Sequence, residues 1–173
     1  MNLTIPDAAL VVLIGPSGAG KSTFAARHFS PTEIVSSDFC RALISGDESN
    51  IAATPEAFRV LHAIARERLR LGQLVVVDAT SVRAVSRKPL VALARKRDRP
   101  AVAIAFDLPL ELCLKRNRLR AGRIVPDDVV RRQHDLMARW RPGLHHEGFD
   151  RVYMFDSAEL ADSAVIDREA LWK

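Results

Sequence analysis

One motif fixes most of what this chain can fold into. Residues Gly15 to Ser22 read GPSGAGKS, a complete phosphate-binding loop of the form GxxxxGK[ST]. The apolar residues 9–14 (ALVVLI) precede it and suit a strand buried on both faces, and a helix is expected to begin at Lys21. Backbone N–H groups at such a helix start can surround a phosphate. We therefore expect nucleotide phosphates to bind between this strand and this helix.

Strand and helix patterns alternate along the rest of the 173 residues. The expected strands are residues 9–14, 33–36, 74–77, 101–106 and 152–155. Helices are expected over residues 39–45, 54–72, 85–97, 110–121 and 126–140, in the segment that begins at Lys21, and in a terminal segment from about Ser157. This order predicts an α/β fold of the P-loop NTPase type, with a five-stranded parallel sheet flanked by helices and ligands at the carboxyl ends of the strands. We expect a single domain over residues 1–173.

The phosphate-binding loop predicts the donor half of a site. Its glycines let consecutive N–H groups turn inward around an anion, Lys21 can reach the β- and γ-phosphates, and Ser22 is the expected Mg²⁺ ligand. Asp78 follows three valines and has the position of a carboxylate that orients the metal directly or through water, although it could instead cap a helix. The loop residues expected to contact ATP are Gly15, Ser17, Gly18, Ala19, Gly20, Lys21, Ser22 and Thr23. ATP and Mg²⁺, or another divalent cation, are the expected cofactors.

The sequence favours a kinase over a nucleotide hydrolase. Motor and transporter ATPases commonly place a glutamate after the metal-orienting aspartate to activate water, whereas Ala79 follows Asp78 here. The guanine-reading pattern Asn-Lys-x-Asp is also missing from the sequence. Both observations argue against a hydrolysing motor or switch.

Asp38 and Arg41 suit the acceptor half of a kinase site. They lie three residues apart at the start of an expected helix, so both side chains can face one cleft. A kinase that acts on an alcohol needs a carboxylate to accept the hydroxyl proton and a cation to hold the acceptor in line. Alternatively, Ser37 or Asp38 caps the helix and Arg41 merely pairs with Asp38. The spacing alone is compatible with both interpretations.

Positive charge is concentrated in two segments of the chain. The formal net charge is +5, but residues 115–141 contain nine basic against three acidic residues, and residues 83–99 contain seven against one. Such clustering favours a polyanionic partner, such as nucleic acid or nucleotide phosphates. No apolar run is long enough to span a membrane and the N-terminus lacks a secretory signal, so we expect a cytoplasmic protein.

Several segments together resemble one enzyme family. They are the phosphate-binding loop, SSDFCR at residues 36–41, VDAT at residues 77–80, and an arginine-rich segment with Arg116, Arg120 and Arg123. With LTIP at residues 3–6 and EGF at residues 147–149, the pattern resembles the kinase module of bacterial polynucleotide kinase-phosphatases, which are RNA end-healing and sealing enzymes. The resemblance runs from residue 3 to the fifth expected strand and covers nearly the whole chain.

The resemblance implies transfer of the ATP γ-phosphate to the 5′-OH end of RNA, DNA or both. It makes Asp38 the general base and Arg41 the contact for the phosphate next to the acceptor nucleoside. Arg116 then belongs to a mobile helical lid over roughly residues 110–141, where its guanidinium can bridge several phosphate oxygens and stabilise the charge in transfer. In the family this module precedes a phosphatase and a ligase domain, and neither is present in this sequence.

Two further features of the resemblance concern single residues. Arg120 and Arg123 would support the lid by contacting phosphate or stacking on adenine; otherwise they form a solvated helix face opposite Leu112 and Leu119. The family often has asparagine after Asp-Ala-Thr, where this chain has Ser81, so any contact of that amide is in doubt.

Two other function classes are compatible with the sequence. A small-molecule kinase for a sugar, an antibiotic or a sugar nucleotide would have a similar loop, base and lid, although the basic excess favours nucleic acid. A non-catalytic, ATP-dependent binding module would need the phosphate-binding loop but not the carboxylate of Asp38.

Overall fold

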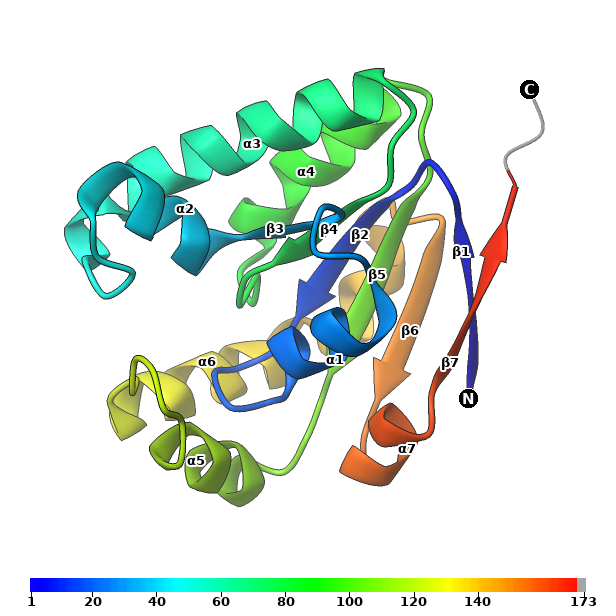
Figure 1. Ribbon diagram of the computed structural model, residues 1–173. Helices are drawn as coiled ribbons and strands as arrows, with labels where there is room; N and C mark the ends of the chain where they lie inside the picture. Colours follow the sequence, from blue (N-terminus) through cyan, green and yellow to red (C-terminus); the bar gives the residue numbers. More distant parts are fainter. Residues whose placement is uncertain (171–173) are drawn as a thin grey trace.

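The computed structural model describes residues 1–170 and confirms the expected α/β fold (Figure 1). Five strands form one parallel sheet in the order β3-β4-β2-β5-β6. Their bounds are Leu10–Ile14 (β2), Ile34–Ser36 (β3), Val75–Asp78 (β4), Ala101–Phe106 (β5) and Arg151–Phe155 (β6). From β2 the chain continues to β3 at one edge of the sheet, and from β5 it continues to β6 at the other edge. Ligands of α/β proteins bind at the carboxyl ends of neighbouring strands whose connections diverge in this way. The phosphate-binding loop leaves the sheet there.

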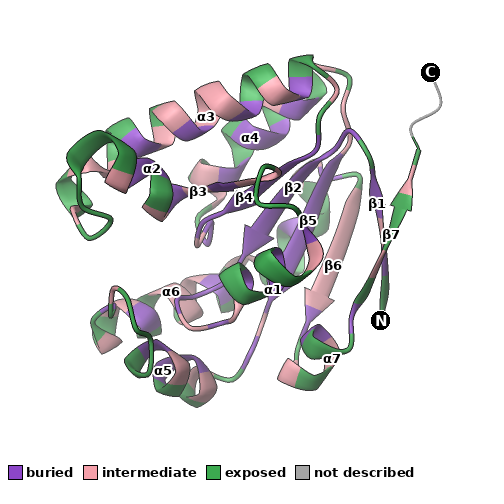
Figure 2. Ribbon diagram, in the orientation of Figure 1, coloured by how far each residue is buried: buried purple, intermediate pink, exposed green. Residues whose placement is uncertain are grey.

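Alternate side chains of β2 explain why the sheet lies between two layers. Leu10, Val12 and Ile14 belong to one hydrophobic cluster, while Val11 and Leu13 belong to the other. Side chains of a strand alternate between faces, so an uninterrupted apolar run is buried on both. Figure 2 shows the buried strands β2, β4 and β5 among helices whose outer surfaces are exposed.

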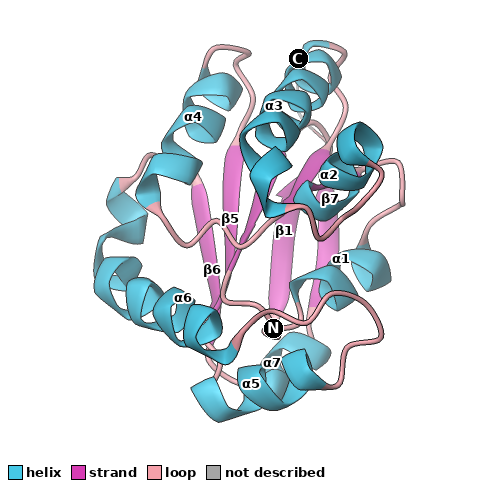
Figure 3. Cartoon of the chain, turned by 90° about the vertical axis from the view of Figure 1, so that its left-hand side faces the viewer, coloured by secondary structure: helices cyan, strands magenta, loops and turns pink. Residues whose placement is uncertain are grey.

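Helices cover both faces of this sheet (Figure 3). Their bounds are Lys21–His28 (α1), Ser37–Ser45 (α2), Thr54–Arg70 (α3), Ala84–Arg95 (α4), Leu110–Arg118 (α5), Asp127–Trp140 (α6) and Ala158–Asp162 (α7), with 3-10 turns at Ile51–Ala53 (η1) and Arg141–His146 (η2). The buried apolar residues of α3 and α4 pack in the cluster of Leu10, and those of α1, α5 and α7 pack in the cluster of Val11. α6 contributes to both clusters, with Met137 in the first and Val130 in the second. Among residues 1–170, no helix combines the length and apolar character that a membrane crossing requires.

The two ends of the described chain form a small second sheet that the sequence did not predict. β1 (Asn2–Pro6) pairs in parallel with β7 (Val165–Glu169). The terminal helix expected from about Ser157 is therefore wrong beyond Asp162, where α7 ends and the chain turns into β7. β7 is mostly exposed and has little apolar pattern of its own, so its pairing with β1 defines it. Trp172, for which the sequence suggests nucleobase stacking or packing, lies outside the described residues.

Arg87 on α4 is completely buried, although the sequence counts it among the charges that favour a polyanion. Its Nε lies 2.6 Å from Oε2 of Glu147, and the two side chains form an ion pair. The guanidinium also donates to the backbone oxygen of Ser81 at 2.7 Å and lies 4.0 Å from the ring centroid of Trp140. One basic residue of residues 83–99 is thus an interior residue and is not available to a ligand.

The Arg87–Glu147 pair supports the phosphate-binding loop from behind. Ser81, which Arg87 contacts, has a left-handed backbone with φ of 46°, a conformation that asparagine tolerates better than serine. The preceding residue, Thr80, accepts the backbone N–H of Gly15 at 3.0 Å. This conformation gives a physical reason for the asparagine that the resembling family often has at this position.

We expect Glu147→Ala to lower the free energy of unfolding by about 3 kcal/mol or more, because it leaves the buried charge of Arg87 without a partner. Urea unfolding followed by circular dichroism measures the change. Glu67→Ala is the control, since Glu67 forms exposed pairs with Arg66 and Arg70 and should affect stability far less. Equal losses for both variants would contradict the supporting role of the buried pair.

Candidate active site

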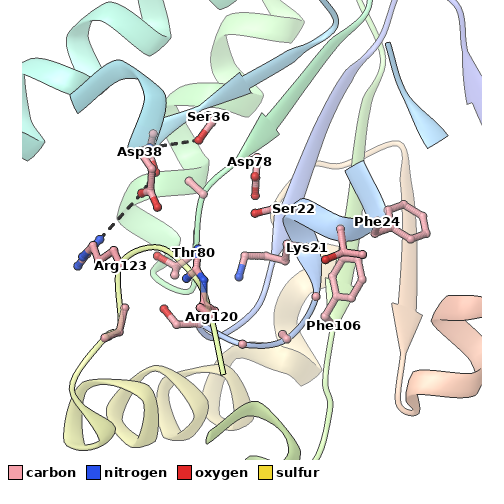
Figure 4. A pocket seen from close by; sticks show the side chains of 18 of the residues that line it. Lys21, Ser22, Phe24, Ser36, Asp38, Asp78, Thr80, Phe106, Arg120 and Arg123 are labelled. Atoms are coloured by element: carbon pink, nitrogen blue, oxygen red, sulfur yellow. Dashed lines mark hydrogen bonds and ion pairs between the residues drawn. The ribbon is translucent and has the colours of Figure 1, made fainter. Parts of the chain in front are cut away.

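A cavity of about 550 Å³ opens where the carboxyl ends of the strands meet the phosphate-binding loop, α2 and the loop between α5 and α6 (Figure 4). Among the residues that the sequence predicts for the site, Gly15 does not line it. The predicted residues that line it are Ser17, Gly18, Ala19, Gly20, Lys21, Ser22, Thr23, Asp38, Arg41, Asp78, Arg116, Arg120 and Arg123. Arg27 and Asp162 line it too, so that six basic side chains face three acidic ones. Such a surplus of positive charge suits a polyanion.

Lys21 begins α1 and is only 7% exposed. Its Nζ donates to the backbone oxygens of Gly15 and Pro16, both at 2.8 Å. Burial lowers the pKa of Lys21 to about 8, and the nearby carboxylate of Asp78 partly opposes that shift. No side chain caps the N-terminus of α1 at Gly20, so the first N–H groups of this helix are left for a ligand. An anion placed here would receive both the ammonium charge and these N–H groups.

Ser22 and Asp78 form a donor pair that suits a hard cation. Both side chains line the cavity (Figure 4). Mg²⁺ prefers such oxygen ligands and is commonly held by few protein ligands, the rest being water and phosphate. Asp78 is the last residue of β4, whereas α4 begins at Ala84, so Asp78 does not cap that helix. The two side chains therefore fit the magnesium that the sequence predicts.

The surroundings of Asp38 correct one of its two interpretations in part. The cap of α2 is Ser36, whose Oγ accepts the N–H groups of Asp38 at 3.2 Å and Phe39 at 3.4 Å; neither Ser37 nor Asp38 is the cap. Arg41 does pair with Asp38, and both side chains nevertheless line the cavity. The side chain of Asp38 is 33% exposed, so its carboxylate is accessible from the cavity.

Two arginines, Arg41 and Arg123, lie near the carboxylate of Asp38. Arg41 is only 4% exposed, and its Nε donates to the backbone oxygen of Glu48 at 2.8 Å. Arg123 approaches Asp38 from the opposite wall, with Nη1 4.0 Å from Oδ1 (Figure 4). Burial lowers the pKa of Arg123, with the positive charge of Arg41 as a further cause. The carboxylate thus lies between two guanidinium groups.

The helix that begins the arginine-rich segment is shorter than the sequence predicts. α5 ends at Arg118 and not at residue 121, and Leu119, expected on the inner side, is 75% exposed. The buried amide of Asn117 explains the ending, because Nδ2 donates to the backbone oxygen of Val125 at 2.7 Å and Oδ1 accepts the N–H of Val125 at 3.2 Å. This pair of bonds closes a loop over residues 119–124.

That loop brings the lid arginines to the cavity without a helix. Arg120 and Arg123 lie on the loop, and Arg116 lies on the last part of α5. A Cβ built at Gly20 would lie 3.5 Å from Nη1 of Arg116, so this guanidinium already lies over the phosphate-binding loop. The alternative of a solvated helix face is therefore wrong about the helix, because Arg120 and Arg123 lie outside it, although Arg120 is exposed.

The base of the lid contacts the phosphate-binding loop directly. A Cβ at Gly18 would come within 2.0 Å of the backbone oxygen of Cys113, and Gly18 has φ of 81°, so only glycine suits this close approach. On α6, Oε1 of Gln133 accepts the N–H of Ser17 at 2.8 Å. Gln133 could not be predicted from the sequence, because one glutamine in a charged helix belongs to no motif.

Most of the chain matches the model of a known protein family. A family model described as an AAA domain matches residues 10–144. A search of the curated proteins found no match. The sequence thus has a family assignment that covers the phosphate-binding loop, α2 and the arginine-rich segment.

Solved structures with a similar fold include several P-loop kinases. A chain of the Pnkp1/Rnl/Hen1 RNA repair complex has a TM-score of 0.68 and 22% identity, with 79% of this chain and 46% of that chain covered. A gluconokinase from Sinorhizobium meliloti 1021 has a TM-score of 0.56 and 17% identity, with 91% and 87% covered. Shikimate kinase from Acinetobacter baumannii in complex with shikimate has a TM-score of 0.53 and 20% identity, with 89% of both chains covered. These similarities show a P-loop kinase fold, which implies ATP binding, and the chain spans less than half of the RNA-repair chain.

Proposed function

Since the chain belongs to this AAA domain family and has a P-loop kinase fold, we propose that it is a polynucleotide 5′-hydroxyl kinase. It transfers the γ-phosphate of ATP to 5′-OH ends of RNA, DNA or both. The observation that carries this proposal is the shared cavity, which joins the phosphate-binding loop at Lys21 to the accessible carboxylate of Asp38 and to the lid arginines. Residues 1–173 act as one kinase domain, with a lid over roughly residues 110–141.

On the donor side, the chain holds the triphosphate with backbone N–H groups and cations. Lys21 leaves the carbonyl oxygens of Gly15 and Pro16 and contacts the β- and γ-phosphates. Ser22 and Asp78 would hold Mg²⁺, Asp78 directly or through water, and the ion would supply positive charge to the phosphates. Arg116 stabilises the charge on the phosphoryl group in transfer, and Arg120 supports it from the loop above.

On the acceptor side, Asp38 acts as the general base. Its carboxylate takes the proton of the 5′-hydroxyl as the 5′ oxygen forms a bond to the γ-phosphorus, while the bond from that phosphorus to the β,γ-bridging oxygen breaks and ADP leaves. Arg41 fixes the carboxylate and, with Arg123, supplies positive charge for the phosphate next to the acceptor nucleoside. An acceptor would enter between the two guanidinium groups that flank Asp38.

A nucleic-acid acceptor is supported by charge and by one structural likeness. The cavity has an excess of basic side chains, and residues 115–141 add further exposed arginines. A chain of the RNA repair complex is among the similar structures, although only 46% of that chain is covered. The gluconokinase and shikimate kinase likenesses make a small-molecule acceptor the second candidate.

A transfer assay with a panel of acceptors tests the proposal. The protein is incubated with γ-labelled ATP and Mg²⁺, with a 5′-OH oligonucleotide of RNA or DNA, a nucleoside, gluconate or shikimate as acceptor. We expect label on the oligonucleotide, and the KM for the oligonucleotide to rise steeply between about 50 and 200 mM salt because phosphate contacts release counterions. The same oligonucleotide with a 5′-phosphate is the control and should remain unlabelled.

Two outcomes would contradict the proposal. Label on gluconate or shikimate but not on the oligonucleotide would assign a small-molecule kinase. ATP binding without transfer to any acceptor of the panel would favour the binding module.

A further inference from the structure

Gln133 lies in the cavity wall at the meeting point of the lid and the phosphate-binding loop. A backbone N–H can only donate, so the carboxamide oxygen of Gln133 must face Ser17, as the 2.8 Å contact shows. The NH₂ end of the same amide then points away from Ser17. Within residues 1–170, no protein group accepts a hydrogen bond from Nε2 of Gln133. The side chain therefore has one end fixed on the loop and one donor end available.

The position of Ser17 decides what the free donor can reach. Ser17 directly precedes Gly18, Ala19 and Gly20, whose backbone lines the anion-binding part of the cavity. Arg116 lies over this same stretch, near Gly20. A donor held at Ser17 is thus next to the backbone N–H groups that would bind the phosphates of a nucleotide.

We propose that Gln133 is a further catalytic residue that contacts the γ-phosphate: Oε1 stays on the N–H of Ser17 and Nε2 donates to a γ-phosphate oxygen. The proposal rests on the proposed function only in taking ATP as the donor. Hydrogen bonds to a charged phosphate are stronger than those between neutral groups. Because α6 carries Gln133, this contact also makes the base of the lid sensitive to whether the bound nucleotide has a γ-phosphate.

The competing explanation is that the hydrogen bond of Gln133 to Ser17 is purely structural, and it makes a different prediction. If Gln133 only holds α6 against the loop, its loss disturbs the loop for every nucleotide that binds there. If Nε2 contacts the γ-phosphate, its loss weakens the binding of ATP and leaves the binding of ADP unchanged. The ratio of the two affinities therefore separates the explanations.

The test measures the Kd of ATP and of ADP by calorimetry, in Mg²⁺ and without any acceptor. Gln133→Ala is expected to raise the Kd of ATP by about 10- to 100-fold and the Kd of ADP by less than about 3-fold. Gln133→Glu keeps an acceptor for the N–H of Ser17 but places a negative charge beside the γ-phosphate, so it should weaken ATP at least as much. Asp135→Asn, an exposed position two residues further on α6, is the control and should leave the ratio of affinities unchanged.

Equal weakening of ATP and ADP by Gln133→Ala, or no weakening of either, would overturn the proposal. Both measurements omit the acceptor, so they read out the contact even if no oligonucleotide is phosphorylated. A wild-type protein that binds neither nucleotide would overturn both this inference and the proposed function.

Discussion

Replacing Asp38 with Asn is expected to reduce the rate of phosphoryl transfer by about 10² to 10⁴-fold, because an amide cannot take the proton of the attacking hydroxyl. Asparagine keeps the size of the side chain and can still accept a hydrogen bond from Arg41. The Kd of ATP should change little, since Asp38 lies across the cavity from the phosphate-binding loop (Figure 4). Single-turnover transfer to a 5′-OH oligonucleotide, together with calorimetric ATP binding, measures both quantities.

Asp47→Asn is the matched control for this variant. Asp47 is exposed in the segment that follows α2 and does not line the cavity, so its removal should leave the transfer rate within a factor of about 3. Unchanged transfer by Asp38→Asn would exclude Asp38 as the general base and would favour a role in pairing with Arg41 alone.

Replacing Lys21 with Met is expected to abolish most of the transfer activity and yet to stabilise the free protein at neutral pH. Removal of a charged group that stabilises the transferred phosphoryl group should cost about 10² to 10³-fold in rate. Without nucleotide, however, burial lowers the pKa of Lys21 from 10.5 to about 8, which means that the folded state disfavours the charged ammonium. Methionine removes that cost and should raise the free energy of unfolding at pH 7 by up to about 3 kcal/mol.

The pH dependence follows from the same pKa. Between pH 8 and pH 10.5 the unfolded state binds the Lys21 proton more strongly than the folded state, so the stability of the wild type rises with pH through this window. Lys21→Met should lack that rise. Urea unfolding at pH 7 and at pH 10, without nucleotide, measures the difference, with the exposed Lys96→Met as control. A variant that transfers phosphate normally, or that loses stability at pH 7, would contradict the account of Lys21.

The sheet could be predicted from the sequence because its central strands β2, β4 and β5 are buried on both faces. Runs such as residues 9–14 and 101–106 are apolar throughout, and this pattern needs no knowledge of distant residues. β7 could not be predicted, because its exposed residues are ordered by pairing with β1 at the other end of the chain. The end of α5 was misplaced for a similar reason, since the bonds of Asn117 to Val125 compete with helix continuation and leave no periodic signal.

Part of the candidate site could be predicted from the sequence, and part of it could not. The phosphate-binding loop, Asp38 and Arg116 belong to local motifs, and the structure brings all of them to one cavity. Gln133 and its partner Ser17 are 116 residues apart, and Arg87 and Glu147 are 60 apart, so tertiary packing alone brings them together. Arg87 shows that charge in the sequence does not by itself indicate exposure. Its charge suggested a contact with a polyanion, whereas the side chain is buried and supports the site from the interior.

The most direct test of a donor on the phosphate-binding loop and an acceptor at Asp38 is one distance. A crystal structure with Mg²⁺, a non-hydrolysable ATP analogue and a short 5′-OH oligonucleotide gives the separation between the Asp38 carboxylate and the terminal 5′ oxygen. We predict about 2.6 to 3.2 Å, with that oxygen on the side of the γ-phosphorus opposite the leaving group. An oligonucleotide whose 5′ oxygen lies outside the cavity, or contacts a base other than Asp38, would contradict the account.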